Sequence, residues 1–165
     1  MTLHAPRPSR GLSNWTIAGS NGTGGPALWH LGSHRSYSPT RALYYGTEPA
    51  HTFNTGARNY GSATSRSISL AGVIAPRLSF AHYLQKEASS VYDRARVMIS
   101  ANGTAWTQLA VYSSTSWMTV VDLDLAAYQN QTIQIRFDFD SVDPYANSFE
   151  GWVIDEVRVT GSGAN

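Results

Sequence analysis

Short segments rich in β-branched and aromatic residues follow one another along most of this chain of 165 residues. Turn residues separate them at fairly regular intervals, and no long amphipathic helical pattern competes with them. Such a series is typical of an all-β fold, a two-sheet antiparallel β-sandwich of the jelly-roll type. The segments with this composition are 14–18, 27–30, 42–45, 67–70, 78–84, 94–100, 107–112, 117–123, 132–140 and 151–159.

The length of the chain favours a single domain, because 165 residues can bury a hydrophobic core of their own. Residues 1–11 contain Pro6 and Pro8 and are predicted to form a flexible lead or linker. The sandwich is predicted over residues 12–160, and residues 161–165 are predicted to form a disordered tail. Flexible segments on both sides are typical of a module that belongs to a longer protein.

The composition argues against several classes of partner. A formal net charge of +1, with only 14% charged residues, gives no broad attraction for nucleic acid or an anionic membrane. No run of 18 apolar residues predicts membrane insertion, and residues 1–10 do not resemble a signal peptide. The chain has no cysteine for disulfides or thiolate metal sites. If the protein is exported, its signal peptide is not in this chain.

One carboxylate stands out in the last predicted strand, residues 151–159. Alternation of side chains along a strand puts Asp155 on the same face as three valines, Val153, Val157 and Val159. A carboxylate buried among valines must be hydrogen-bonded, ion-paired or bound to a cation, because an isolated buried charge costs several kcal/mol or more. This position therefore indicates a metal site or a buried polar network.

Most acidic residues are predicted to gather at one end of the sandwich. If successive strands run antiparallel, their ends alternate, and seven of the 11 acidic residues fall at the same end. These are Glu48, Glu87, Asp93, Asp140, Asp143, Glu150 and Asp155. Clustered carboxylates with loop carbonyls and Asn147 suit Ca²⁺, whereas no histidine or cysteine spacing for zinc is found.

Calcium is therefore the expected cofactor, with Asp155, Asp93, Glu87, Glu48 and Asp143 as its candidate ligands. The alternative is that arginines pair with these carboxylates, and the candidates are Arg94, Arg136 and Arg158. His82 shares a face with Leu78, Phe80 and Leu84 and is predicted to be a core histidine rather than a ligand.

Aromatic residues raise the possibility of a ligand surface. The five Trp and nine Tyr residues exceed what a core of this size needs, and sugar rings stack on exposed aromatic faces. Trp29, Tyr60 and Tyr145 lie in or beside loops and are the candidate ligand-binding residues, although packing beneath a loop is the favoured interpretation for each. Trp106 and Trp117 are predicted to form the core flank of their hairpin.

Several sequence motifs, taken in order, resemble those of bacterial MAM-like jelly-roll modules and the similar cleaved-adhesin modules. They include Ala42-Leu-Tyr-Tyr-Gly46, Val97-x-Ile-Ser-x-Asn-Gly-x-x-Trp106, Ile135-Arg-Phe-Asp-Phe139 and Gly151-Trp-Val-Ile-Asp155. Such modules accompany secreted proteases of the immune inhibitor A type and other extracellular multidomain proteins. The resemblance, over residues 12–160, implies an antiparallel sandwich, calcium binding and extracellular localisation. Ser100-Ala-Asn-Gly departs from the family's usual Ser-x-Asp-Gly.

The expected function is thus that of a non-catalytic extracellular accessory or adhesion module. Its expected partners are neighbouring domains of a longer secreted protein and a glycan or cell-surface protein. One alternative is a self-associating structural subunit, in which residues 12–18 add a strand to another copy. Another is a carbohydrate-active enzyme, although no Gly-x-Ser-x-Gly or His-Glu-x-x-His motif supports catalysis.

Overall fold

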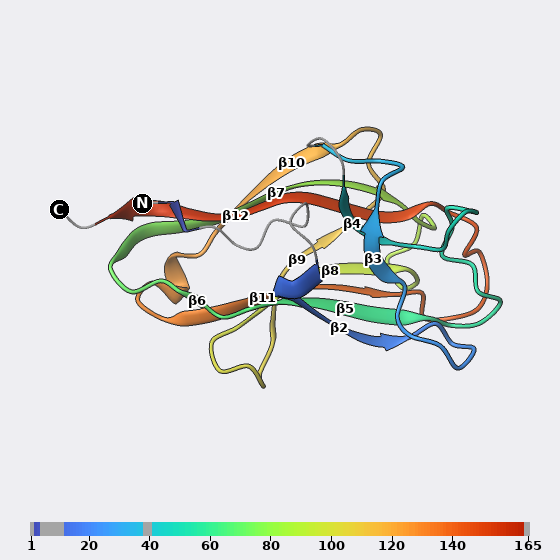
Figure 1. Ribbon diagram of the computed structural model, residues 1–165, viewed down its shortest axis with the longest axis horizontal. Coiled ribbons are helices and arrows are strands. Elements are labelled where there is room, and N and C mark those ends of the chain that lie inside the picture. Colours follow the sequence, from blue (N-terminus) through green and yellow to red (C-terminus); the bar gives the residue numbers. More distant parts are fainter. Residues whose placement is uncertain (1, 4–11, 38–40, 164–165) are drawn as a thin grey trace.

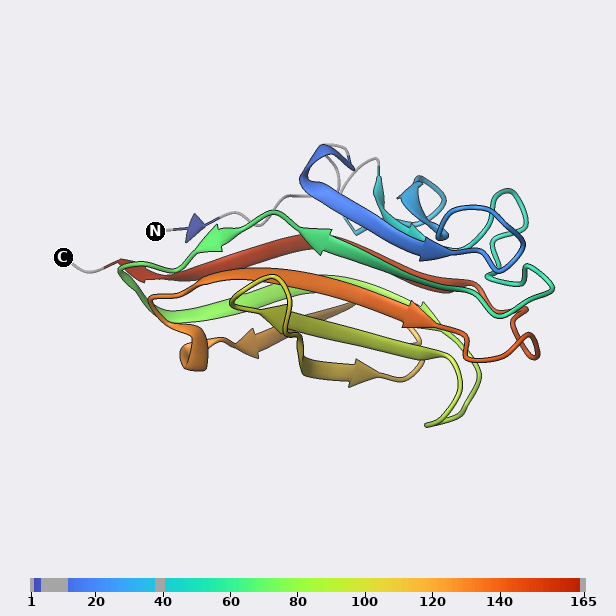
Figure 2. The ribbon, with the colours of Figure 1, turned by 90° about the horizontal axis from the view of Figure 1, so that it is seen from below.

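The computed structural model describes residues 2–3, 12–37 and 41–163. Within these residues, two six-stranded antiparallel sheets pack face to face, as Figures 1 and 2 show. The first, here the β12 sheet, has the order β10 (Thr119–Asp124), β7 (Val73–Gln85), β12 (Gly151–Gly163), β4 (Ala42–Tyr45) and β3 (Trp29–Gly32), with β1 (Thr2–Leu3) also beside β12. The second, the β11 sheet, has the order β2 (Trp15–Ser20), β5 (Tyr60–Ser65), β11 (Thr132–Asp140), β8 (Arg94–Ser100) and β9 (Thr107–Tyr112), with β6 (Ile68–Ser69) also beside β11.

Helical structure among the described residues consists of two short 3₁₀ turns, η2 (Leu12–Asn14) and η3 (Ala126–Tyr128). No helix in the described ranges is long and apolar enough to cross a membrane. The predicted fold class, a two-sheet antiparallel β-sandwich, is confirmed.

Alternating side chains of β11 form the centre of the core. Ile133, Ile135, Phe137 and Phe139 are buried, while the residues between them are half-buried. The ring of Phe137 lies 5.2 Å from that of Phe80 and 5.8 Å from that of Trp152, measured between centroids. Because Phe80 and Trp152 belong to the β12 sheet, these edge-to-face contacts join the two layers.

His82 lies in this core, as predicted. Its imidazole is buried, and its Nδ1 accepts a hydrogen bond from the indole N–H of Trp152 at 3.1 Å. Burial lowers the pKa of His82 from 6.5 to about 4, because a buried site disfavours the charged ring. The histidine is therefore a neutral, hydrogen-bonded member of the core.

The segment considered for strand donation pairs within its own chain. β2 lies antiparallel to β5, with Trp15 opposite Ser65 and Ile17 opposite Ala63. Strand pairing also involves residues of the predicted lead and tail. β12 continues through residues 161–163, which the sequence placed in a tail, and Thr2 and Leu3 of the predicted lead pair with β12. Residues 4–11 of the lead and residues 164–165 of the tail lie outside the described residues.

A bulge in β12 changes which residues face the core. The register against β7 shifts between Asp155 and Arg158, and Glu156 has a φ of +52°. Before the bulge, Val153 packs with Ala42 and Tyr44 outside the main core. After it, Val157 and Val159 join the main core. The prediction that Val153, Asp155, Val157 and Val159 share one face is therefore wrong, because the extra residue reverses the alternation.

Candidate functional site

Three loops meet at one end of the sandwich, on the right in Figure 1. They are residues 46–59, 86–93 and 141–150. β4 and β7 both end where β12 begins, with Tyr45 opposite Trp152 and Gln85 opposite Gly151. β11 ends beside the start of β8 in the other sheet, with Asp140 opposite Arg94. The antiparallel strands thus bring Glu48, Glu87, Asp93, Asp140, Asp143 and Glu150 to the same end, as the alternation of strand ends predicts.

Asp93 is the most deeply buried carboxylate of these loops. Its Oδ2 accepts the backbone N–H of Glu87 at 2.9 Å, while its buried Oδ1 has no hydrogen-bond partner among the described residues. Burial raises the pKa of Asp93 to about 6, and the nearby charges of Glu87 and Asp143 act in the same direction. Lys86 acts oppositely, but its ammonium donates to two backbone carbonyls, those of Glu87 and Ser89.

Asn147 adds a second buried oxygen in the 141–150 loop. Its Nδ2 donates to the carbonyl of Asp143 at 3.0 Å, and its Oδ1 has no hydrogen-bond partner within the described chain. The loop is held by Ser141, whose hydroxyl donates to the same carbonyl at 2.9 Å. Asp93 and Asn147 therefore each carry a buried oxygen without a hydrogen-bond partner among the described residues, as an oxygen ligand of a hard cation would. The ligand atoms of Glu87, Asp93 and Asp143 do not all lie within 4.8 Å of one another in the described structure.

Asp155 is not part of this group. It lies opposite Ala81, four residues along β12 from Gly151, which corresponds to about 13 Å along the strand. Its buried carboxylate accepts the backbone N–H of Tyr37 at 2.9 Å and that of Glu156 at 2.7 Å. Asp155 is therefore not grouped with Asp93 as expected. It was expected at the end of its strand, but it lies in the interior of β12.

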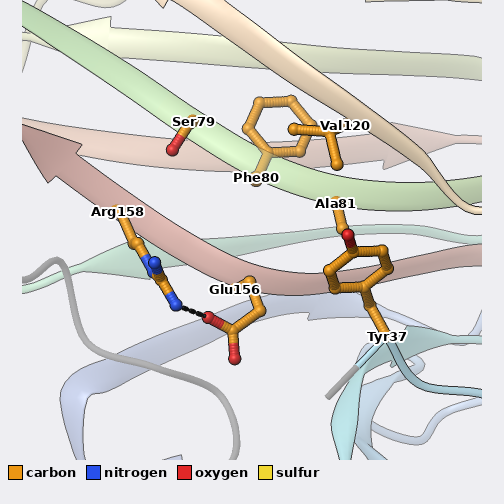
Figure 3. A pocket seen from close by; sticks show the side chains of 7 residues that line it. All are labelled: Tyr37, Ser79, Phe80, Ala81, Val120, Glu156 and Arg158. Carbon is orange, nitrogen blue, oxygen red and sulfur yellow. Dashed lines mark hydrogen bonds and ion pairs between the residues drawn. The ribbon is translucent and has the colours of Figure 1, made fainter.

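A hollow of about 210 Å³ opens beside this bulge, over strands β7, β10 and β12 (Figure 3). In Figure 3, Tyr37 stands on one side of it, and the Glu156–Arg158 ion pair stands on the other. Tyr37 is 57% exposed. The residues that line the hollow are Tyr37, Ser79, Phe80, Ala81, Val120, Glu156 and Arg158. The arrangement combines an accessible ring face with charged hydrogen-bonding groups.

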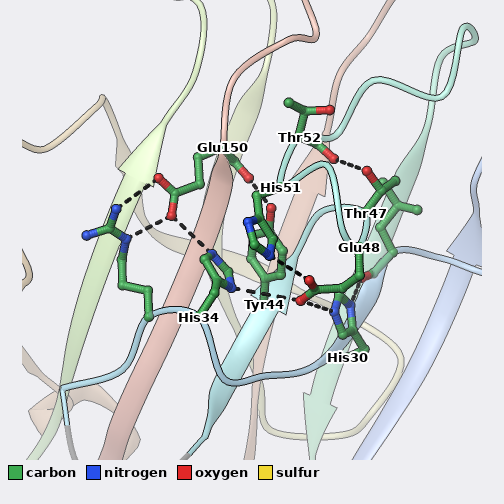
Figure 4. Close-up of polar contacts among 10 residues, drawn as sticks. His30, His34, Tyr44, Thr47, Glu48, His51, Thr52 and Glu150 are labelled. Carbon is green, nitrogen blue, oxygen red and sulfur yellow. Dashed lines mark hydrogen bonds and ion pairs between the residues drawn. The ribbon is translucent and has the colours of Figure 1, made fainter.

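Glu48 lies in a separate cluster of histidines, shown in Figure 4. Its carboxylate contacts His30 Nε2 at 3.3 Å and His51 Nε2 at 2.6 Å. Burial would raise the pKa of Glu48, but its contacts with the surrounding histidines outweigh burial and lower the pKa. The spacing of these histidines along the chain does not indicate a metal site, yet donor atoms of His34, Glu48 and His51 all lie within 4.8 Å of one another.

The predicted arginine partners lie elsewhere. Arg158 pairs with Glu156, Arg94 donates to the carbonyl of Val91, and Arg136 donates to the hydroxyl of Thr64. Other arginines pair with the more accessible carboxylates: Arg58 with Asp140, Arg96 with Asp138, and Arg35 with Glu150. Within the described part of the chain, no arginine forms an ion pair with Glu87, Asp93 or Asp143.

The candidate ligand-binding aromatics differ in exposure. Trp29 is only 3% exposed, and its indole N–H donates to the carbonyl of Gly61, so this candidate is packed in the core and offers no open ring face. Tyr60 and Tyr145 are exposed, and the Arg58 guanidinium lies 5.4 Å from the ring centroid of Tyr60. Trp117, predicted to flank the core, is 80% exposed. Exposure of a single aromatic side chain depends on loop geometry, which alternation along strands does not predict.

Comparison with known proteins shows limited sequence similarity. No protein-family model matches the chain. Bacillopeptidase F of Bacillus subtilis (strain 168) is 29% identical over 156 residues, which is 91% of this chain. The match covers 10% of the length of that protein, so the chain spans about a tenth of the curated relative it matches.

Solved structures share the fold over nearly the whole chain. The K1 cleaved adhesin domain of Lys-gingipain from Porphyromonas gingivalis W83 has a TM-score of 0.65 and 16% identity, and the match covers 99% of each chain. TmCBM61, solved in complex with β-1,4-galactotriose, has a TM-score of 0.64 and 11% identity, with 95% of each chain covered. At these identities the similarity establishes the β-sandwich fold.

Proposed function

We propose that this chain is a non-catalytic, extracellular binding module of a larger secreted protein. The similarity to a tenth of Bacillopeptidase F supports a place within a longer chain. The shared fold of an adhesin domain and a galactotriose-bound module supports binding rather than catalysis. The feature of the molecule that carries the proposal is the hollow beside Tyr37 (Figure 3).

The proposed ligand is a carbohydrate. The exposed ring of Tyr37 offers an apolar face on which a sugar ring can stack. Glu156 and Arg158 offer an acceptor and donors for hydroxyl groups on the opposite side. At about 210 Å³ the hollow is smaller than the roughly 300–1,000 Å³ of pockets for drug-sized ligands, which favours one sugar ring of a longer glycan.

Asp155 has a role in this proposal without binding a metal. It accepts the backbone N–H of Tyr37 from one side of the hollow and that of Glu156 from the other. One buried carboxylate thereby fixes the tyrosine loop relative to the bulge. A site held in place before the ligand arrives loses less conformational entropy on binding.

Calcium is the proposed structural cofactor, held by Glu87, Asp93 and Asp143 with Asn147. The two buried oxygens without hydrogen-bond partners among the described residues support this set. Ca²⁺ would satisfy them and offset the repulsion between neighbouring carboxylates. Asp155 and Glu48 are left out of the set, since the first is satisfied by backbone N–H groups and the second is surrounded by histidines.

Carbohydrate binding is tested by screening the chain on a glycan array and titrating the best ligand by calorimetry. Tyr37→Ala is expected to weaken binding by about fivefold or more, because stacking a flat ligand on an aromatic side chain contributes about 1–3 kcal/mol where nucleic-acid bases are bound in this way. Tyr60→Ala and Tyr145→Ala are the matched controls, since both remove exposed tyrosines at the loop end. These two variants are expected to bind within about twofold of the original chain.

Two outcomes would contradict the proposal. If no glycan binds the chain, the carbohydrate ligand is wrong. If Tyr60→Ala or Tyr145→Ala abolishes binding while Tyr37→Ala does not, the ligand site lies at the loop end and the hollow is not used.

A further inference from the structure

The cluster around Glu48 joins loops that are separate in sequence. His30 lies in β3, His34 follows that strand, and Glu48 and His51 follow β4. In Figure 4 the three imidazoles surround the Glu48 carboxylate. His30 Nε2 and His34 Nδ1 lie 3.3 and 3.8 Å from its Oε1, and His51 Nε2 lies 2.6 Å from its Oε2. The donor atoms of His34, Glu48 and His51 all lie within 4.8 Å of one another, and His30 contacts the same carboxylate from one side.

In His30 and His34, the hydrogen bond made by the ring nitrogen that points away from Glu48 determines whether the other nitrogen has a lone pair for a metal ion. His30 Nδ1 lies 2.8 Å from the carbonyl oxygen of Leu28, and His34 Nε2 lies 3.1 Å from Oε1 of Glu150. Both oxygens only accept hydrogen bonds, so both of these nitrogens carry the proton. In the neutral rings, His30 Nε2 and His34 Nδ1 are then lone-pair donors.

These lone pairs face a carboxylate oxygen, which is also an acceptor. His34 Nδ1 is buried and has no hydrogen-bond partner among the described residues. Its ring stacks on that of His51, with centroids 4.1 Å apart and planes 12° apart. Protonating both stacked rings would place two positive charges side by side, which is unfavourable. A cation between the rings and Glu48 satisfies the same lone pairs without that repulsion.

We propose that His34, Glu48 and His51 bind a divalent transition metal of the zinc class, as three protein ligands that leave a fourth position open. Zn–ligand bonds of about 2.0–2.1 Å in a tetrahedron place the donor atoms about 3.3 Å apart. The distance from Glu48 Oε1 to His34 Nδ1 is 3.8 Å and that from Glu48 Oε2 to His51 Nε2 is 2.6 Å, so the two lie on either side of that value. Imidazole and carboxylate donors suit Zn²⁺, whereas Ca²⁺ prefers oxygen alone.

Hydrogen bonds around the cluster hold its side chains in place, as in protein metal sites whose ligands are oriented by neighbouring groups. Glu150 accepts from His34 and is itself held by Arg35, through Nε at 2.8 Å and Nη2 at 3.1 Å. The Glu150 backbone carbonyl accepts the hydroxyl of Tyr44 at 2.6 Å, and the Tyr44 ring lies 4.4 Å from that of His34. A carboxylate that orients a histidine in this way raises its basicity as a ligand. The ion would join the loop after β3 to the loop after β4.

Zinc binding is tested by calorimetry on the untagged chain, freed of metal by dialysis and titrated with ZnCl₂ in excess calcium. One equivalent is expected to bind, and Glu48→Gln and His51→Gln are each expected to weaken binding by at least about tenfold. His51 is partly exposed, so its substitution leaves the core intact, and circular dichroism verifies the fold of each variant. Co²⁺ in place of Zn²⁺ should give the intense visible absorption of a four-coordinate site.

Three control variants separate this site from the rest of the molecule. Asp122→Asn removes an exposed carboxylate of β10, His82→Gln removes a core histidine, and Asp93→Asn disrupts the proposed calcium set. All three are expected to bind zinc like the original chain. Failure to bind one equivalent, equal affinity in the Glu48 and His51 variants, or the weak spectrum of octahedral Co²⁺ would overturn the proposal. None of these results depends on whether the chain binds a glycan.

Discussion

The two buried aspartates, Asp93 and Asp155, differ in how the protein satisfies their carboxylate oxygens. Asp155 lies where backbone N–H groups of Tyr37 and Glu156 point at its carboxylate, so its negative charge is stabilised within the protein. Asp93 receives one such bond, from Glu87, and its second oxygen lacks a partner among the described residues. Burial of a carboxylate thus indicates a cation only when its oxygens are otherwise unsatisfied.

Removal of calcium should distinguish these two residues. At a calcium concentration about 100-fold above the dissociation constant, binding contributes about 2.7 kcal/mol. A chelator should therefore lower the melting temperature by about 5–10 °C in a chain of this length. Asp93→Asn should abolish that shift. In chelator it should melt at or above the original chain, because the raised pKa of Asp93 shows that its charge is unfavourable there.

Asp155→Ala is the control for the calcium experiment. It leaves the N–H groups of Tyr37 and Glu156 without their acceptor, which costs about 1–3 kcal/mol with or without calcium. The shift on adding chelator should stay the same as in the original chain. A melt that is insensitive to chelator, or a shift lost in Asp155→Ala and kept in Asp93→Asn, would contradict the proposed ligand set.

His82 predicts a dependence of stability on pH. Its pKa falls from 6.5 in the unfolded chain to about 4 in the folded one, so between these values only the unfolded chain takes up the proton. Stability is therefore complete above pH 6.5 and decreases as the pH falls towards 4, by about 3 kcal/mol for this group. Denaturant unfolding at several pH values should show a smaller decrease in His82→Gln. Equal slopes in both proteins would be inconsistent with a neutral core histidine.

At the scale of single elements, composition predicts strands whose side chains are large. Residues 42–45, 94–100, 107–112 and 132–140 match β4, β8, β9 and β11 in full. β5 was missed, because Tyr60-Gly-Ser-Ala-Thr-Ser65 lacks large apolar residues, although it lies between β2 and β11. Its small side chains are needed because Ala27, Trp29 and Tyr45 pack closely against Gly61 of this strand. That requirement comes from residues distant in sequence, so local composition does not reveal it.

Gly61 of β5 provides the test of this close packing. A Cβ atom at this position would lie 2.7 Å from Cβ of Ala27 and 3.3 Å from side-chain atoms of Trp29 and Tyr45. Gly61→Ala should therefore destabilise the protein by about 1–3 kcal/mol through overpacking. Ser62→Ala, on the neighbouring half-buried position, should change the free energy of unfolding by less than about 0.5 kcal/mol. Denaturant unfolding measures both, and a neutral Gly61→Ala would show that the sheets separate easily at this point.

At the scale of the whole molecule, the loops after β4, β7 and β11 lie together at one end of the sandwich. Counting antiparallel strands predicts this gathering of acidic residues from the sequence alone. It does not predict how the carboxylates divide between the loops around Asp93, where calcium is proposed, and the histidine cluster around Glu48. That division depends on the paths of the loops. The positions of His34, Glu48 and His51 in the sequence do not predict that their side chains come together.

The bulge at Glu156 also affects how this sequence should be compared with its relatives. β12 begins with its even-numbered residues Trp152 and Ile154 in the core and continues with the odd-numbered Val157 and Val159. A relative without the bulge would have one residue fewer in this strand, and its core residues would alternate without interruption. An alignment that forbids a gap inside this strand would then match core positions with surface positions over half its length. Such an alignment would also misplace Glu156 and Arg158, which line the hollow beside Tyr37.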